Sequence, residues 1–291
     1  MKPTSIADRL ERVVGIDGSP RRLRSAIEWE LIHHFGLPPI RASERAEAAE
    51  PAVARIISRR AAQCEQNGTS PVLYMLGVYS DVVAGFCYVL PFDASYVSAI
   101  KLQRVHADAI HDAMRGLSFA DFERFGARVL TEMGAKYSFV TPQGGDQGID
   151  FYGSFSVGQL HNVPSPFLKL AQDVVISFAG QAKHYPNRSV GPDVVRELIG
   201  AVSLARTKTF SRPGLDLFRD LDLKPFSPLV TLLFTTGGIT TGAAELADSA
   251  GIIARSGEQL AVFLADRGVG VVHTAQCSIF SPQAFRNWLD G

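Results

Sequence analysis

A carboxylate and a Gln-x-Lys sequence stand at the ends of two predicted strands. Asp150 opens the strand predicted for 149–157, and Gln181 and Lys183 close the strand predicted for 174–183. Residues two apart on a strand point to the same face, so the Gln181 and Lys183 side chains should project together. Burying a lysine at the end of an apolar strand costs free energy unless a carboxylate or a phosphate pairs with its charge. On this strand alone, a solvated strand end is the alternative interpretation.

Phosphodiester hydrolysis is the chemistry that these residue types suit. The reaction needs a hard cation that neutralises charge and generates hydroxide. Mg²⁺ takes oxygen ligands, usually one or two carboxylates together with waters and phosphate oxygens. An ammonium group beside the cation can orient the attacking water or stabilise the charge at phosphorus. Asp150 followed by Gln181 and Lys183 therefore indicates a phosphodiesterase site.

The turn before Asp150 has the sequence PQGGDQG and is rich in glycine. Gly144, Gly145 and Gly148 permit a tight turn with positive φ and leave room for close approach of the backbone. Asp146 lies in the same turn. Because an aspartate in such a turn commonly forms only an Asx turn, Asp146 is a weaker candidate than Asp150.

Alternating helices and strands are predicted to position these residues from about residue 117 onward. Ser118 can cap the first helix, and Gly134 can end it. The helical and strand patterns that follow cover 136–141, 149–157, 174–183, 194–206, 229–236, 243–250, 251–254 and 258–265. Strands joined by helical crossovers predict an α/β fold, a mixed sheet with helices on both faces.

The first 116 residues have a different pattern. Helical segments are predicted over 20–35, 48–64 and 94–115, and two β-rich runs lie within 72–90. The second helical segment carries Arg55, Arg59 and Arg60. We expect a small α+β domain at 1–116 and a second domain at 117–291, with the boundary at Gly116-Leu117.

Composition removes several classes of protein. Lysine plus arginine equals aspartate plus glutamate at 29 each, so a strongly basic nucleic-acid binder is excluded while a local basic face stays open. A hydrophobic share of 46% and a charged share of 20% are ordinary for a globular protein. No GxGxxG after a strand, no P-loop and no GxSxG sequence occurs.

Cysteine usage and hydropathy bear on the compartment. The three cysteines are widely spaced and form no CxxC, so we interpret them as buried apolar residues and not as a disulfide framework or zinc site. Residues 1–12 are polar, without the apolar stretch of a signal peptide. The apolar runs are too short to cross a bilayer. We expect a cytoplasmic protein without a membrane anchor.

Four ordered blocks resemble the catalytic domain of the Mrr restriction-endonuclease family, a branch of the PD-(D/E)XK nuclease superfamily. They lie between about Leu117 and Gly268 and read FERFGARVLTEMGAKYSFVTPQGGDQGIDFYG, ISFAGQAKHY, VVRELIGAV and FTTGGITTGAAELA. No block is specific alone, but four in this order are. The resemblance implies a restriction-endonuclease-like core in which a mixed sheet is flanked by helices.

The resemblance also implies roles for individual residues. Asp150 matches the metal-binding aspartate, and Gln181 with Lys183 matches the Gln-x-Lys form of the catalytic motif. Glu123 matches the helical glutamate that completes such sites, and Asp146 matches the turn acid. An amide oxygen at Gln181 can ligate Mg²⁺ but brings no charge, which Glu123 could restore. An exposed helix acid is the alternative for Glu123. The implied metal set is Asp150, Gln181, Glu123 and Asp146, with Mg²⁺ as cofactor and Mn²⁺ as a substitute.

The implied function is endonucleolytic cleavage of double-stranded DNA in host defence, by a homodimer or higher assembly, with residues 1–116 supplying target recognition. One alternative is a structure-specific nuclease of repair or of DNA junctions. A second is a DNA-binding protein that no longer cuts. An unrelated α/β enzyme with a fortuitous match is the weakest alternative, because the commonest motifs of such enzymes are missing.

Two segments depart from the family pattern, 157–173 and 210–228. We interpret them as surface decoration or as a dimer contact, with contact to DNA as the alternative. Arg188, Arg196 and Arg206 are candidates for DNA phosphate contacts, with scattered surface charge as the alternative. His184 should point away from the face of Lys183, so we do not expect it to be catalytic.

Overall fold

The computed structural model describes residues 2–77, 81–142, 148–159, 173–207, 226–273 and 277–291. Two compact units make up the chain. The first comprises Met1–Asp108 and Val262–Ser281, and the second comprises Ala109–Ala261 and Pro282–Gly291. The division at 116/117 that the sequence suggests stays a prediction.

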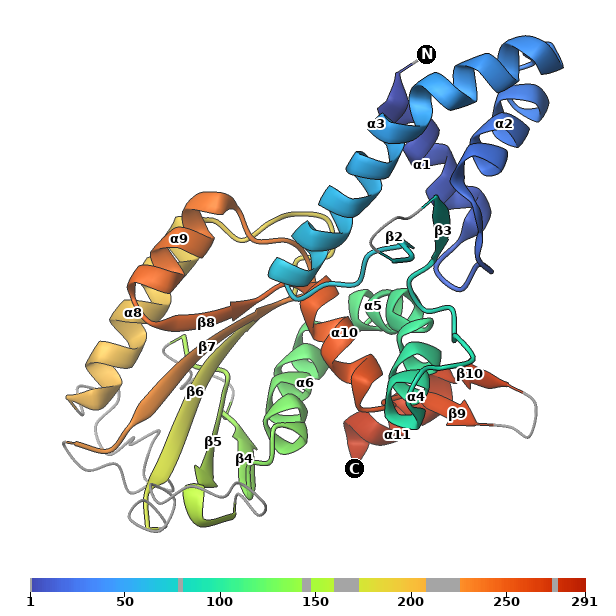
Figure 1. Cartoon of the computed structure of the whole chain (residues 1–291). Helices are drawn as coiled ribbons and strands as arrows, with labels where there is room; N and C mark the ends of the chain where they lie inside the picture. The colour runs from blue at the N-terminus through green and yellow to red at the C-terminus, as the bar shows by residue number, and fades with distance from the viewer. Residues whose placement is uncertain (1, 78–80, 143–147, 160–172, 208–225, 274–276) are drawn as a thin grey trace. The chain divides into compact units, whose positions relative to one another are not determined.

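The first unit combines helices with a small sheet, and its strand order is β1-β3-β2 (Figure 1). Its apolar core joins α1, α2 and α3. The elements up to residue 115 are α1 (Pro3–Val14), β1 (Arg21–Arg22), α2 (Leu23–His33), α3 (Pro39–Gln66), β2 (Leu73–Met75), β3 (Val82–Gly85), α4 (Ser95–Arg104) and α5 (Ala107–Arg115).

The second unit is built on a five-stranded sheet with the order β4-β5-β6-β7-β8. The pairs β4–β5 and β5–β6 are antiparallel, and the pairs β6–β7 and β7–β8 are parallel. The elements after residue 115 are α6 (Phe119–Glu132), β4 (Tyr137–Val140), β5 (Phe151–Ser156), the 3₁₀ turn η1 (Val157–Gln159), β6 (Val175–Lys183), α8 (Pro192–Arg206), β7 (Leu229–Thr235), α9 (Thr241–Ser249), β8 (Ile252–Arg255), α10 (Gly257–Asp266), β9 (Val271–His273), β10 (Ser278–Phe280) and α11 (Pro282–Asp290). Of these, β9, β10 and the second part of α10 belong to the first unit. The predicted α/β class with a mixed sheet is confirmed.

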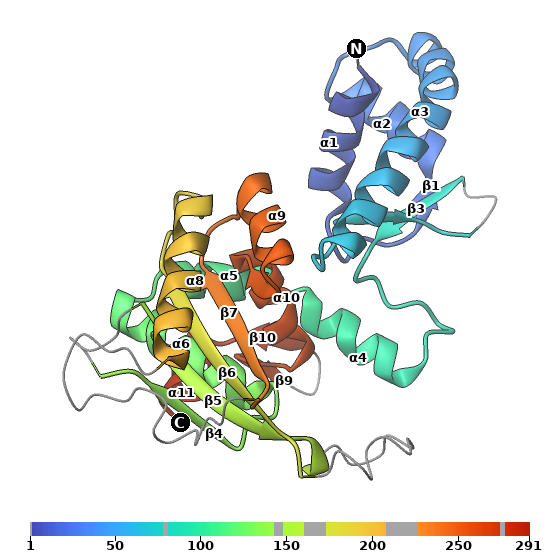
Figure 2. The same cartoon turned by 90° about the vertical axis from the view of Figure 1, so that its left-hand side faces the viewer.

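Helices cover both faces of this sheet (Figure 2). On one face, α6 approaches so closely that a Cβ on Gly126 would lie 2.3 Å from the Phe151 ring. Phe151 stacks on Phe234 of β7, with ring centroids 5.2 Å apart. On the other face, α8 and α9 bury apolar side chains of their own against Tyr152, Ala179 and Leu233. The residues of the sheet that point toward α8 therefore alternate with those that point toward α6.

Several predicted helices and strands agree closely with those in the structure, and other elements of the structure were not predicted. Ser118 caps α6 as expected, because its side chain accepts a hydrogen bond from the backbone N–H of Asp121 at 3.1 Å. The helical prediction over 94–115 was too coarse, since two helices, α4 and α5, occupy it. The sequence analysis did not predict α1, the β9–β10 hairpin or α11. Within the described ranges, none of the helices is long and apolar enough to cross a membrane.

Candidate active site

Asp150 is fixed where β5 begins and separates from β6. Its backbone N–H donates to the carbonyl of Gly180 at 2.9 Å, and its own carbonyl accepts from Thr141 N–H at 2.9 Å. The carboxylate oxygen Oδ2 accepts from the backbone N–H of Ala182 at 2.7 Å. The side chain thus continues the ladder of hydrogen bonds beyond the end of the strand pairing. Asp150 is buried, and its carboxylate is held against the segment that carries Gln181 and Lys183.

Gln181 directly precedes Ala182, whose backbone N–H binds this carboxylate. Gln181 is only 1% exposed, and its Oε1 atom is buried without a hydrogen-bond partner among the described residues. Leaving a buried acceptor unsatisfied costs about 1–3 kcal/mol, so such an atom calls for a ligand. An amide oxygen next to a carboxylate suits a hard cation such as Mg²⁺. The donor set therefore fits the cation that the sequence predicts.

Gly148 lets the turn approach Gln181 from the side of α8. Its φ is +84°, in the left-handed region that favours glycine. A Cβ at this position would lie 3.3 Å from the Ala201 Cβ and 3.4 Å from Gln181 Nε2. The expectation that this glycine combines positive φ with close approach is confirmed.

Lys183 ends β6 and meets a carboxylate from α8. Its Nζ lies 3.7 Å from Glu197 Oε1, with side-chain exposures of 20% for Lys183 and 57% for Glu197. The same carboxylate would lie 3.9 Å from a Cβ at Gly148. Glu197 therefore borders the site. Glu197 was not predicted from the sequence, although one signal was available: it stands four residues before the buried Ala201, so both share one side of α8.

Glu123 lies on α6, the helix that covers the face of Phe151. It is partly buried in the second turn of that helix, directly after Phe122. The Phe122 ring is 5.7 Å from the ring of His184, so the first turns of α6 lie next to the end of β6. The role of Glu123 stays a prediction.

Asp146 lies outside the described residues, as do most of the segments 157–173 and 210–228. Among the residues that the structure does describe, no three His, Cys, Asp or Glu side chains form a group that could hold a metal ion. The oxygen donors brought together here are instead one carboxylate and one amide, from Asp150 and Gln181.

Both ring nitrogens of His184 lie within hydrogen-bond distance of neighbouring residues. Its Nε2 lies 2.5 Å from the carbonyl oxygen of Leu117, which can only accept, so Nε2 carries the proton. Its Nδ1 then accepts from the Thr236 hydroxyl at 3.2 Å. Burial lowers the pKa of His184, in keeping with a neutral ring. This arrangement supports the interpretation that His184 is not catalytic.

The three candidate DNA-contacting arginines are all exposed, but they differ in surroundings. The Arg188 guanidinium lies 3.6 Å from the centre of the Tyr185 ring, a cation–π contact that orients it. Arg206 donates to the carbonyl of Ser227 at 3.3 Å. Arg196 directly precedes Glu197 on α8. Their contacts with DNA stay predictions.

Residues 114–210 match the family model Mrr_cat, described as restriction endonuclease. This segment is therefore similar to the Mrr restriction-endonuclease family. The match contains Asp150, Gln181, Lys183 and Glu197, and it ends before the fourth block recognised in the sequence.

Two solved structures of restriction endonucleases are similar to the chain. One is the MspJI restriction endonuclease in complex with a 27-mer oligonucleotide, with 19% identity, a TM-score of 0.36, and coverage of 62% of this chain and 36% of that one. The other is the DNA modification-dependent restriction endonuclease AspBHI, with 20% identity, a TM-score of 0.39, and coverage of 64% and 39%. The chain thus spans less than two fifths of the length of either. A search of curated proteins finds no match.

Proposed function

We propose that this protein is a metal-dependent endonuclease that hydrolyses double-stranded DNA, and that it acts in restriction. The surroundings of the Asp150 carboxylate give the main support for this proposal. The Asp150 carboxylate is fixed by the N–H of Ala182, and the preceding Gln181, on the strand that ends in Lys183, has a buried oxygen without a hydrogen-bond partner among the described residues. The match of this segment to a restriction-endonuclease family supports the same reaction.

Asp150 and Gln181 would hold Mg²⁺, with Mn²⁺ as a substitute and with Glu123 and Asp146 as further ligands. Such a cation supplies charge neutralisation and lowers the pKa of water. Lys183 would direct its ammonium group at the scissile phosphate and stabilise the charge that grows there. Glu197 keeps this ammonium group in place before DNA arrives, because the two side chains form an ion pair.

The assembly and the recognition region belong to the same proposal. Cutting both strands of a duplex takes two active sites, so we expect a homodimer or higher assembly on DNA. Residues 1–116 would supply target recognition. A hollow on the first unit supports this role, because the described residues that line it include Lys2, Arg55 and Arg59 and no acid. Cations around such a hollow suit contact with phosphates.

The decisive experiment compares the native protein with Lys183→Ala on methylated and unmethylated plasmid in the presence of Mg²⁺. We expect discrete cutting by the native protein and a loss of about 10²–10³-fold in rate for the variant, the usual cost of one group that stabilises transition-state charge. The methylation state that is cut identifies the restricted DNA. If both proteins bind DNA and neither cuts any substrate, the interpretation as a DNA-binding protein without cleavage replaces this one.

A further inference from the structure

Thr141 continues the row of polar side chains that contains Asp150 and Gln181. The β4–β5 register ends at Val140↔Phe151, so the next opposed pair is Thr141 and Asp150. The hydrogen bond from Thr141 N–H to the Asp150 carbonyl, at 2.9 Å, confirms this pairing. The β5–β6 pairing ends at Phe151↔Gly180, and beyond it Asp150 bonds to the residues on either side of Gln181, through its N–H to Gly180 and through its carboxylate to Ala182. Three neighbouring strands therefore present one polar residue each at the same end of the sheet.

The side chains of this row share the face that α8 covers. Phe139 stands two residues before Thr141, and its ring stacks on Tyr152 with centroids 5.3 Å apart. Tyr152 lies with Ala179 in the core beneath α8. Because side chains alternate along a strand, Thr141 points to the side of Phe139, and Gln181 points to the side of Ala179. Opposed residues on one face have Cβ atoms about 4.5–5.5 Å apart, which brings Thr141 next to Asp150.

The Thr141 hydroxyl is buried and unused. The residue is 4% exposed, and its Oγ1 has no hydrogen-bond partner among the described residues. Other buried threonines of the same sheet end differ, since Thr235 Oγ1 accepts from Gly237 N–H at 3.2 Å and Thr236 Oγ1 bonds to His184. A threonine hydroxyl can rotate toward any partner within reach, so an unsatisfied one is costly.

Thr141 Oγ1 and Gln181 Oε1, which have no hydrogen-bond partner within the described part of the chain, thus belong to residues on either side of Asp150. We propose that the Thr141 hydroxyl is a third oxygen donor of the divalent-cation site, opposite Gln181 across Asp150. This assignment rests on the proposed nuclease site and adds a residue to it. It also gives the cation a set of oxygen donors drawn from three adjacent strands, with a single charge among them.

The test uses Thr141→Val, which keeps the shape and removes the hydroxyl, and Thr141→Ser, which keeps the hydroxyl. Titration calorimetry with Mn²⁺ on the whole chain should show about tenfold weaker affinity for the valine variant, as for other residues that support a metal site. The serine variant should bind within about twofold of the native protein. Thr241→Val, an exposed position at the start of α9, is the matched control and should change nothing.

A second readout separates a cation donor from a structural hydroxyl. Without metal, Thr141→Val should melt at the same temperature as the native protein or higher, because it removes an unsatisfied buried group. Unchanged Mn²⁺ affinity, or a lower melting temperature without metal, overturns the proposal for Thr141.

Asp150→Asn distinguishes failure of this proposal from failure of the proposed function. If the Asp150 variant loses Mn²⁺ binding and cleavage while Thr141→Val keeps native affinity, only the role of Thr141 is wrong. If Asp150→Asn binds Mn²⁺ and cuts DNA as the native protein does, the nuclease site itself is wrong, and Thr141 with it.

Discussion

Gln181 gives the candidate site an amide oxygen where a carboxylate would bring a negative charge. Glu197 supplies a carboxylate from α8, and it forms an ion pair with Lys183 at 3.7 Å. An exposed pair of this kind adds little stability, about 0–1 kcal/mol. We therefore infer that the role of Glu197 is to position the Lys183 ammonium group, and not to stabilise the fold.

Glu197→Gln tests this assignment. We expect kcat for DNA cleavage to fall about tenfold, the lower range for residues that orient a catalytic group. The affinity for DNA should stay equal or rise, because a negative charge near the bound phosphate disappears. Single-turnover cleavage and binding titrations measure the two effects separately. Glu245→Gln on α9, another exposed helical acid, is the control. An unchanged kcat would remove Glu197 from the site.

At the residue scale, the motif residues could be predicted and their supporting residues could not. Asp150, Gln181 and Lys183 follow from residue type and from alternation along a strand. The contact of Glu197 depends on how α8 packs on the sheet, a tertiary relation. Thr141 depends on the β4–β5 register and on which buried groups remain without partners, and neither is visible in the chain order.

At the scale of elements, His184 fastens the end of β6 to the start of α6. Its ring bridges the Leu117 carbonyl and the Thr236 hydroxyl, and the Phe119 and Phe122 rings lie 5.2 and 5.7 Å from it. Burial favours the neutral ring, in which Nδ1 accepts from the Thr236 hydroxyl; on protonation, Nδ1 would instead donate to that hydroxyl. The strand that carries Gln181 is therefore anchored by an uncharged histidine.

This anchor predicts a pH dependence of stability. Burial lowers the pKa of His184 in the folded protein below its usual value of 6.5. The unfolded chain then binds more protons, so the contribution is complete above pH 6.5 and is lost as pH falls toward the lowered pKa. Urea unfolding of the native protein and of His184→Gln between pH 7.5 and 5 measures it. The difference in unfolding free energy between the two proteins should shrink as pH falls, because only the native protein has His184. The other histidines titrate in both proteins, so their contributions cancel in the difference. A difference independent of pH would contradict the neutral anchor.

Elements with one dominant pattern were predicted better than those with conflicting signals. The apolar run 229–236 became β7, and the helix over 194–206 became α8, with shifts of a few residues at the ends. The prediction of a helix over 48–64 was too short. The helix α3 has 28 residues and begins at Pro39, so the segment 39–47 was missed, although the predicted range already contained Pro51. Pro51 lies inside the helix, where it interrupts helical hydrogen bonding at a local cost. Tertiary packing against α1 and α2 overrides that local cost.

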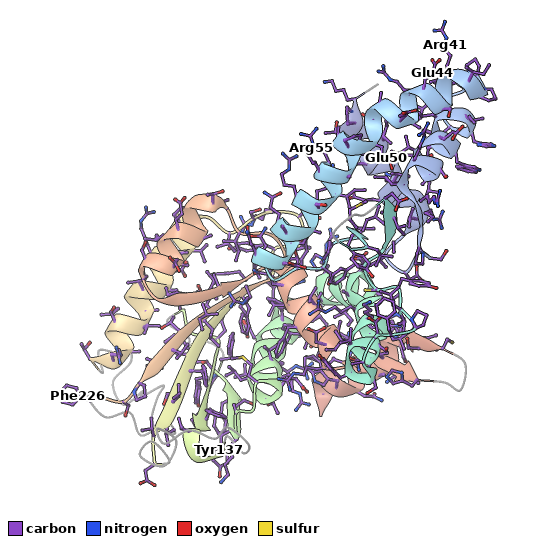
Figure 3. The ribbon with its side chains drawn as sticks, viewed as in Figure 1. Arg41, Glu44, Glu50, Arg55, Tyr137 and Phe226 are labelled. Atoms are coloured by element: carbon purple, nitrogen blue, oxygen red, sulfur yellow. The ribbon has the colours of Figure 1, made fainter. Side chains whose placement is uncertain are left out.

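At the scale of the whole molecule, a net charge of zero conceals an uneven distribution of charge. On the first unit, Arg60 is paired with Asp8 and Glu11, whereas its neighbour Arg59 lines the hollow together with Arg55 and Lys2. Figure 3 shows Arg55 on the outer side of α3. Its Nε donates only to the carbonyl of Pro51, at 3.1 Å, so its charge meets no carboxylate among the described residues.

If the residues lining this hollow contact DNA, Arg55→Ala combined with Arg59→Ala should weaken binding and flatten its salt dependence. Each phosphate contact contributes about one unit to the slope of log affinity against log salt, so the double variant should lose about two units. The cleavage rate at saturating DNA should not change, because these residues belong to the first unit and the candidate active site to the second. Arg41→Ala is the matched control on the same helix, where Glu44 stands three residues further on (Figure 3). A slope equal to that of the native protein would remove the hollow from the DNA interface, and target recognition would then have to use other residues of 1–116.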